Sequence, residues 1–418
     1  MFVNGGELER AEREFESLAS LDDERLDEAA LVRARADGFA GRSEVGRYRG
    51  SFEPAREYAQ EALERFSRID DEVGRSDVLN ALGGIEAQTD NPEAAKGYYQ
   101  RALELRRDLE DETKVASTLA NLGLVEITLG EFESAAAHAR TSLQIRREIQ
   151  YPWGEALSLA VLSRIELENG TLHEAERYAR LALDIRVEIG DSIGVASTSN
   201  NLGKIAFDRG ALDDARERYE SLLDDVEDPE FDWIRRDVYY GLAQTLSELG
   251  EPETAIEYAE RAIDLLEENE SKRTELQTVR ARTLLDSGDL DDARTVAERA
   301  HERASGLGDE PRTLASVTLG EVYVRSGETD DGTSLLRTAI ESAPTAVLEG
   351  RCRRQYATAL CETGDVSDAL AELRRAAACF SSVEAGVRAR KTALDALELA
   401  HELGDDDAVS ALEQRLVR

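Results

Sequence analysis

Apolar and small residues recur along this chain at helical spacing, in blocks of about 40 residues. One block has Leu119, Leu122 and Ile127 before a glycine turn, then Ala135 and Ala139 after it. Apolar positions three or four residues apart predict amphipathic helices, and no alternating pattern of useful length predicts a strand. Each block therefore predicts two helices joined by a tight turn, and the chain as a whole predicts an all-α fold.

The turn itself repeats as a short motif in which a small residue follows the turn residue by five positions. A helix that ends in a tight turn favours glycine, because glycine adopts positive φ without strain. The small residue lets the two helices approach closely, since a larger side chain would overpack the contact. The copies are GSFEPA (50–55), DNPEAA (90–95), GEFESA (130–135), GTLHEA (170–175), GALDDA (210–215), GEPETA (250–255), GDLDDA (288–293) and the weaker GETDDG (327–332), GDVSDA (364–369) and GDDDAV (404–409).

The spacing of these motifs predicts how the chain is organised. It is constant from residue 50 to 250 and varies afterwards, so we expect a regular array over 26–270 and more divergent units over 271–418. The last helix, around 405–417, is charged on one face and can cap the array. Residues 1–25 contain only a second helix, over 6–20, which is either a lone capping helix or the remainder of a preceding part.

The pattern Leu122-Gly123, followed by Ala135 and a further small residue seven positions later, resembles the tetratricopeptide repeat. The roughly 40-residue period is similar to the variety in kinesin light chains, LGN-type polarity adaptors and sensor arms of signalling ATPases and transcription regulators. The resemblance implies an α-solenoid, a right-handed superhelix of about ten helix pairs whose first helices line a concave peptide-binding groove. The first unit departs from the pattern, with Arg42 and Ser43 in place of Leu-Gly, and units after 272 drift.

Charge limits the classes of partner. The formal net charge is −37, from 51 basic and 88 acidic residues, and only five of the basic residues are lysines. Direct binding to nucleic acid or to an anionic membrane surface requires clustered cations, so neither is expected. Acidic residues at this density repel one another. This repulsion is tolerable where salt shortens the Debye length to about 3 Å near 1 M. The composition therefore predicts a halophilic, haloarchaeal source.

The sequence contains no apolar run long enough for a membrane span and no signal peptide at its start. Three cysteines, Cys352, Cys361 and Cys379, are too few for a disulfide framework and are expected as small buried residues. A cytoplasmic location follows from both observations.

Catalytic motifs are missing from the sequence. It has no phosphate-binding G-x-x-x-x-G-K-[ST] loop, no G-x-S-x-G elbow, and no second histidine four residues after any of its His-Glu pairs. We therefore expect neither an enzyme nor a bound cofactor or metal.

The first helices carry candidate groove residues in the register set by Gly123 and Gly203. The two positions before the leucine of this register hold amides, which both donate and accept hydrogen bonds and so suit a peptide main chain. In the resembled adaptors, an Asn at the position of Asn121 and Asn201 holds the main chain of the bound peptide. These candidate amides are Asn80, Asn121, Asn200 and Asn201.

The position after the glycine supplies two cations in adjacent units, Arg164 and Lys204, and Gln244 in the next. The cations suit an acidic group of a ligand, and Tyr240 is expected near the same groove. The alternative is structural: the amides bond to neighbouring helices, and the cations offset Glu168 and Asp208.

These observations lead to two hypotheses. The first is a non-enzymatic scaffold that binds a peptide or protein segment in the groove of residues 113–250. The second is a sensor arm of a signalling ATPase or transcription regulator whose effector domain is missing or is a separate subunit.

Overall fold

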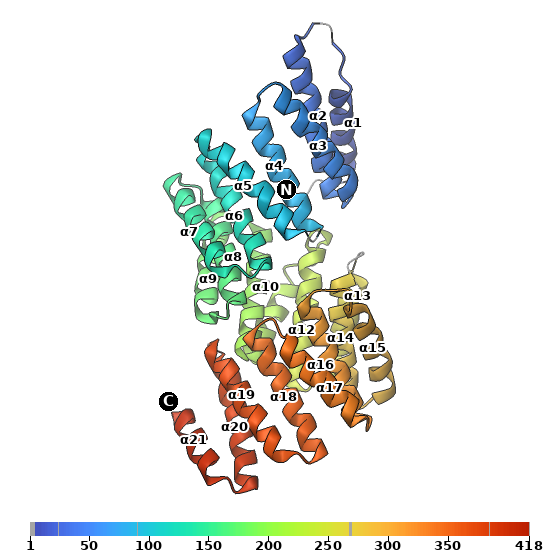
Figure 1. The fold of residues 1–418 in the computed structure, drawn as a ribbon, viewed down its shortest axis with the longest axis vertical. Coiled ribbons are helices and arrows are strands. Elements are labelled where there is room, and N and C mark those ends of the chain that lie inside the picture. The colour runs from blue at the N-terminus through green and yellow to red at the C-terminus, as the bar shows by residue number, and fades with distance from the viewer. Residues whose placement is uncertain (1–4, 24, 90, 267–269, 384, 418) are drawn as a thin grey trace. The chain divides into compact units, whose positions relative to one another are not determined.

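The computed structural model describes residues 5–23, 25–89, 91–266, 270–383 and 385–417, and over these ranges it contains twenty-one α-helices and no strand. The chain divides into two compact units, Met1–Ile165 (unit 1) and Glu166–Arg418 (unit 2). Within each unit, consecutive helices pack side by side, as Figure 1 shows. The predicted all-α solenoid is confirmed, whereas the predicted boundaries at 25/26 and 270/271 concern repeat regularity and stay predictions.

The helices form pairs, preceded by a single helix α1 (Gly5–Ala19) that packs against α2. The first helices of the pairs are α2 (Glu28–Tyr48), α4 (Glu72–Gln88), α6 (Glu112–Thr128), α8 (Pro152–Glu168), α10 (Ser192–Arg209), α12 (Asp232–Leu249), α14 (Glu270–Ser287), α16 (Asp309–Arg325), α18 (Ala346–Thr363) and α20 (Gly386–Leu403). The second helices are α3 (Phe52–Arg68), α5 (Pro92–Asp108), α7 (Phe132–Glu148), α9 (Leu172–Ile189), α11 (Leu212–Leu223), α13 (Pro252–Asp264), α15 (Leu290–Ala304), α17 (Thr329–Ser342), α19 (Val366–Ser382) and α21 (Asp406–Val417). A short 3-10 turn, η1 (Pro229–Phe231), precedes α12.

Glycines with positive φ end the first helices, as the repeated motif predicts. This left-handed conformation strains residues with a Cβ, which explains why the turn residue is so regularly glycine. The glycines concerned are Gly50, Gly130, Gly170, Gly210, Gly250, Gly288, Gly327, Gly364 and Gly404. The turn residue of the motif DNPEAA, Asp90, lies outside the described residues.

A second set of left-handed residues ends the second helices, at the same 40-residue spacing. Here only Gly190 is a glycine, and Asp70, Glu110 and Gln150 hold φ values of 52°, 54° and 53°. The sequence pattern does not predict this set, because most of its members are unsuited to the conformation that they adopt.

The small residues of the motif are buried where the two helices of a pair meet. Six of them are fully buried at equivalent positions of α3, α5, α7, α9, α11 and α13: Ala55, Ala95, Ala135, Ala175, Ala215 and Ala255. A close approach also explains Gly203 of α10, since a Cβ there would lie 2.5 Å from Cε1 of Tyr219. The Tyr219 ring lies between Gly203 and Gly241 of α12.

Buried arginines join neighbouring repeats. The Arg146 Nη1 group donates to the carbonyl oxygen of Gly154 at 2.8 Å and to the Ser158 hydroxyl at 3.0 Å. Forty residues later, Arg186 donates to the Gly194 carbonyl oxygen at 2.7 Å. Each guanidinium thus connects a second helix to the start of the next first helix, and burial lowers the pKa of both arginines.

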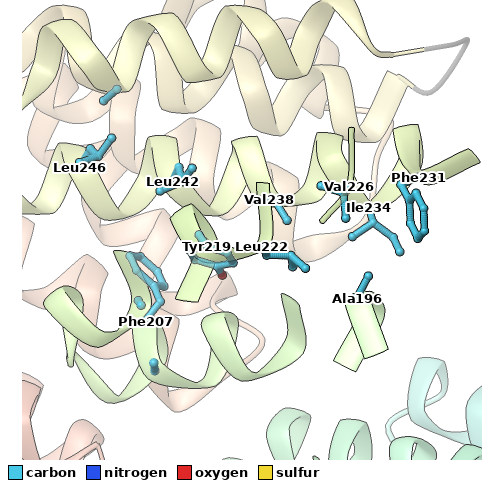
Figure 2. Packing of buried hydrophobic residues seen from close by; sticks show 13 residues of the cluster. Ala196, Phe207, Tyr219, Leu222, Val226, Phe231, Ile234, Val238, Leu242 and Leu246 are labelled. Atoms are coloured by element: carbon cyan, nitrogen blue, oxygen red, sulfur yellow. The ribbon is translucent and has the colours of Figure 1, made fainter. Parts of the chain in front are cut away.

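The apolar core continues from one pair to the next. Figure 2 shows one cluster in unit 2, in which side chains from α10, α11 and α12 meet. Phe207, Tyr219, Val238 and Leu242 belong to this cluster, and each is at most 3% exposed. These contacts fix α10 and α12 of unit 2 against each other, and we take the positions opposite this core as the inner surface of unit 2.

Candidate functional site

Unit 2 contains a cavity of about 820 Å³, and its lining residues come mainly from α12, α14, α16, α18 and α20. These are five successive first helices. The register of the sequence continues through them, because a residue equivalent to Gly203 lies seven positions before each turn glycine. The position directly after it lines the cavity in all five helices: Gln244, Arg282, Glu321, Thr358 and Glu398.

The two positions before the leucine of the register also line the cavity in three of these helices, and one of the two does so in a fourth. They hold no asparagine there. The residues are Thr278 and Val279 in α14, Val317 and Thr318 in α16, Arg354 and Gln355 in α18, and Asp395 in α20. The cavity is therefore the inner surface that the register predicts, continued into units where the sequence motif is weak.

Ion pairs cross one side of the cavity between α14 and α16. Arg282 pairs with Glu321 and lies 3.4 Å from Asp286. Arg325 lies 3.8 Å from the same Asp286. Burial raises the pKa of the Glu321 carboxyl although Arg282 and Arg325 oppose the shift. The charges on this side are largely matched within the protein.

Three arginines lie near Glu248, which also lines the cavity. Arg388 donates to Glu248 Oε2 at 2.7 Å, and Arg351 lies 3.5 Å from Oε1. Burial alone would raise the pKa of the Glu248 carboxyl, but Arg388, Arg351 and Arg354 hold it below its usual range. Arg351 and Arg388 also stack near Phe207, at 5.2 and 4.9 Å from the ring centroid.

The first and last repeats of unit 2 meet beside this arginine group. Arg388 of α20 donates through Nε to the carbonyl oxygens of Phe207 and Asp208, at 3.2 and 3.1 Å, at the end of α10. Leu172 packs in one cluster with Phe380 and Val383. Unit 2 thus closes around its cavity.

The predicted residues of unit 2 lie on the first two of its first helices. Asn200 and Asn201 are half-buried on α10, and Lys204 is exposed with its Nζ 4.0 Å from Glu168 Oε1. Gln244 lines the cavity and donates to the Tyr240 hydroxyl at 2.9 Å. Of these five residues, only Gln244 is part of the cavity lining.

The buried carboxyl group of Glu275 links Lys204 and Tyr240 to the cavity. Glu275 lines the cavity and accepts a hydrogen bond from Lys272 at 3.1 Å. Burial raises the pKa of Glu275, and the positive charges of Lys272 and Lys204 oppose that shift. The Lys272 ammonium also lies 5.3 Å from the centroid of the Tyr240 ring. The positive charge of Lys204 therefore acts on the pKa of a carboxyl group in the cavity lining, although Lys204 is not part of that lining.

The predicted residues of unit 1 lie on α4, α6 and α8. The Asn80 side-chain oxygen accepts a hydrogen bond from Arg106 at 3.0 Å, and the Asn121 amide lies 3.5 Å from the same oxygen. Asn80 thus takes part in the contact between repeats that the structural alternative describes. Arg164 is exposed on α8.

The sequence interpretation missed the cavity arginines because it stopped at residue 250, where the motif loses its Leu-Gly pair. The turn glycines at 288, 327 and 364 carry the register further and would have pointed to Arg282 and Arg354. One further expectation is wrong. Of the cysteines, only Cys352 is buried, whereas Cys379 is partly exposed and Cys361 is exposed, because it faces the cavity.

Two features absent from the described residues concern metal binding and membrane insertion. They contain no group of three or more His, Cys, Asp or Glu side chains that is arranged to hold a metal ion. No helix in this described part of the chain combines the length and apolar character that a membrane span needs.

Comparison with solved structures shows similar folds. A Rap protein complexed with competence and sporulation factor is 14% identical, with a TM-score of 0.59, over 84% of this chain and 98% of the other. Aspartyl phosphate phosphatase F from Bacillus subtilis is 11% identical, with a TM-score of 0.57, over 82% and 95%. The Rap conjugation gene regulator of plasmid pLS20, in complex with the Phr* peptide, is 15% identical, with a TM-score of 0.56, over 81% and 90%.

Comparison with curated protein sequences gave no significant match. Family models described as tetratricopeptide repeat match residues 33–108, 74–148, 155–228, 237–269 and 275–299. Together these ranges cover more than half of the chain and agree with the helix pairs of the structure. The chain therefore belongs to the tetratricopeptide-repeat family.

Proposed function

We propose that this protein is a non-enzymatic scaffold that binds a peptide or protein segment on the inner surface of unit 2. The observation that carries the proposal is the cavity of about 820 Å³, to which five successive first helices present equivalent positions. A volume of this size is typical of ligand sites. Repetition of the inward positions suits an extended ligand, which can meet one repeat after another.

The residues expected to bind the peptide main chain are the amides of α10 and α12. Asn200, Asn201 and Gln244 can both donate and accept, and the Gln244 side chain lies at the cavity wall. Lys204 is the cation expected to meet an acidic group. In unit 1 the same register holds Asn80, Asn121 and Arg164, which form the corresponding part of the proposed surface there.

The solved complexes support the class of ligand. One of the similar structures is a complex with the Phr* peptide, and another is a complex with competence and sporulation factor. We propose the same class of partner here, without a direct role for nucleic acid or membrane.

A regulatory arm is the second candidate. One of the similar structures is described as a conjugation gene regulator in complex with a peptide. In this alternative, a peptide bound to the inner surface controls an effector that is a further domain or a separate subunit. Both candidates share the binding step and differ in whether the bound state changes the activity of a second protein.

The test is selection of peptides from a phage-displayed random library on the wild-type protein, in high-salt buffer. The variant Asn201→Ala/Lys204→Glu/Gln244→Ala should lose the selected peptides, with a decrease in retention of at least about 10-fold. A variant with Asn169→Ala and Arg299→Glu, at exposed positions away from the cavity lining, serves as the control.

Circular dichroism should first show that both variants keep the helical content of the wild type. If the selected peptides bind both variants as well as the wild type, the proposed surface is wrong. If no peptide is selected at all, the proposal of peptide binding fails.

A further inference from the structure

One part of the cavity of unit 2 differs in charge from the chain as a whole. The whole sequence carries 51 basic and 88 acidic residues. At the side of the cavity formed by α12, α18 and the start of α20, four cations face two carboxylates. The cations are Arg351, Arg354, Arg388 and Lys391, and the carboxylates are Glu248 and Asp395.

These four cations differ in how far their N–H groups already donate hydrogen bonds within the protein. Arg388 is 4% exposed and its donors go to Glu248 and to the carbonyl oxygens of Phe207 and Asp208. Arg354 donates to Asp395 at 3.1 Å. Both cations therefore serve contacts within the protein.

Arg351 and Lys391 are different. The contact of Arg351 with Glu248 is 3.5 Å, beyond the usual range of a hydrogen bond, and Arg388 already occupies that carboxylate at 2.7 Å. Lys391 is exposed, lines the cavity, and has no ion pair with any described residue. These two cations have donors available for a group inside the cavity.

The charged side chains of α20 that line the cavity change from positive to negative along the helix. Lys391 is followed at successive turns by Asp395, Glu398 and Glu402, all of which line the cavity. With a rise of 1.5 Å per residue, the helix positions of Lys391 and Glu402 are about 16 Å apart. An extended peptide of about five residues spans that length. A second anionic group on the ligand would meet Glu398 and Glu402 and be repelled.

We infer that the cavity binds a dipolar extended peptide along α20. An anionic group, carboxylate or phosphate, lies against Arg351 and Lys391, and a basic group lies against Glu398 and Glu402. Arg351 suits this role because its planar guanidinium can donate two parallel hydrogen bonds to one carboxylate or phosphate. The inference rests on the proposed function, since it names the ligand class of that same inner surface.

The experiment measures retention of synthetic peptide pools on the immobilised full-length protein by mass spectrometry. Each pool is acetylated and amidated, with three random central residues between fixed ends. Two pools are dipolar, Lys-X-X-X-Asp and its reverse Asp-X-X-X-Lys. Two are like-charged, Asp-X-X-X-Asp and Lys-X-X-X-Lys. A fifth pool carries phosphoserine in place of the Asp of the first and separates phosphate from carboxylate as the anionic group.

One dipolar orientation should be retained at least about 10-fold above both like-charged pools. Arg351→Gln/Lys391→Gln should abolish this preference, and Glu398→Gln/Glu402→Gln should shift retention toward Asp-X-X-X-Asp. Arg390→Gln, at the exposed neighbour of Lys391 outside the cavity lining, should bind as the wild type does.

Equal retention of all pools, or a preference that survives Arg351→Gln/Lys391→Gln, overturns the inference. If phage selection still recovers peptides that depend on Asn201, Lys204 and Gln244, the proposed function stands while the dipolar site fails. If neither experiment detects a peptide, both fail together.

Discussion

Arg388 donates a hydrogen bond through Nη2 to the carbonyl oxygen of Phe207 at 2.7 Å, although 181 residues separate them. Phe207 lies in the last turn of α10, where the final carbonyl groups lack the usual partner four residues on, and its carbonyl oxygen also accepts from the Gly210 N–H at 2.9 Å. Arg388 supplies donors to that helix end and at the same time pairs with Glu248. One side chain therefore joins the first helix of an early repeat of unit 2 to that of the last.

Replacing Arg388 by Ala should destabilise unit 2 strongly. The change leaves Glu248 and the carbonyl groups of α10 with fewer partners in a buried place, and breaking such a pair costs about 3–5 kcal/mol. Lys should restore only part of the loss, because an ammonium cannot reproduce the planar set of donors. Urea unfolding monitored by circular dichroism measures the effect, with Arg390→Ala as the control on the same helix. An unchanged unfolding midpoint for Arg388→Ala would contradict the closing role of this arginine.

The left-handed residues between repeats offer a stabilising change. Glu110 and Gln150 hold φ values of 54° and 53° at positions equivalent to Gly190. Since a left-handed residue with a Cβ is strained by about 1–2 kcal/mol, Glu110→Gly and Gln150→Gly should each raise the melting temperature. Gly190→Ala should lower it. Thermal unfolding of the three single variants tests this, and a lower melting temperature for both glycine variants would refute it.

Two glycines of the first helices should respond differently to the same substitution. A Cβ at Gly203 would lie 2.5 Å from the buried Tyr219 ring, which cannot move because Gly241 lies on its other side. At Gly123 the nearest atom to such a Cβ is the Ala135 carbonyl oxygen at 3.3 Å. Gly203→Ala should therefore cost about 1–3 kcal/mol by overpacking, and clearly more than Gly123→Ala. Equal costs in chemical unfolding would mean that the Tyr219 ring is free to move.

These particular residues show what the sequence predicts and what it does not. The turn glycines and the buried alanines follow from local requirements, positive φ and close helix approach, and so leave a repeated pattern. The inner register follows from the same pattern and extends to Arg282 and Glu398. The contact of Arg388 with Phe207 leaves no such pattern, because it joins repeats that are distant in sequence and occurs once. The hydrogen bond between Asn80 and Arg106 follows the structural alternative for the amides, but the repeat pattern could not name its partner, since that depends on the neighbouring helix.

Glu275 predicts a pH dependence of stability. Burial raises the pKa of this cavity carboxyl above its usual value. A carboxyl whose pKa is raised by folding favours the folded state while it is protonated, and this contribution is lost as pH rises through the folded pKa. Glu275→Gln should therefore be more stable than the wild type at pH 7, and the difference should vanish below about pH 4.5. Urea unfolding at both pH values tests the sign. A variant that is less stable than the wild type at pH 7 would show that the pair with Lys272 dominates.

The net charge of −37 predicts that stability rises with salt. Repulsion between surface carboxylates acts over about 10 Å at 0.1 M salt and over about 3 Å at 1 M, so added KCl should raise the melting temperature steeply. Sucrose at a matched osmolality serves as the control, because it stabilises folded proteins without screening charge. The ion pairs of the cavity lie in partly buried positions and should be weakened less than the surface repulsion. Thermal unfolding in a KCl series measures the balance. A melting temperature that is constant or falls with KCl would contradict the halophilic origin that the composition predicts.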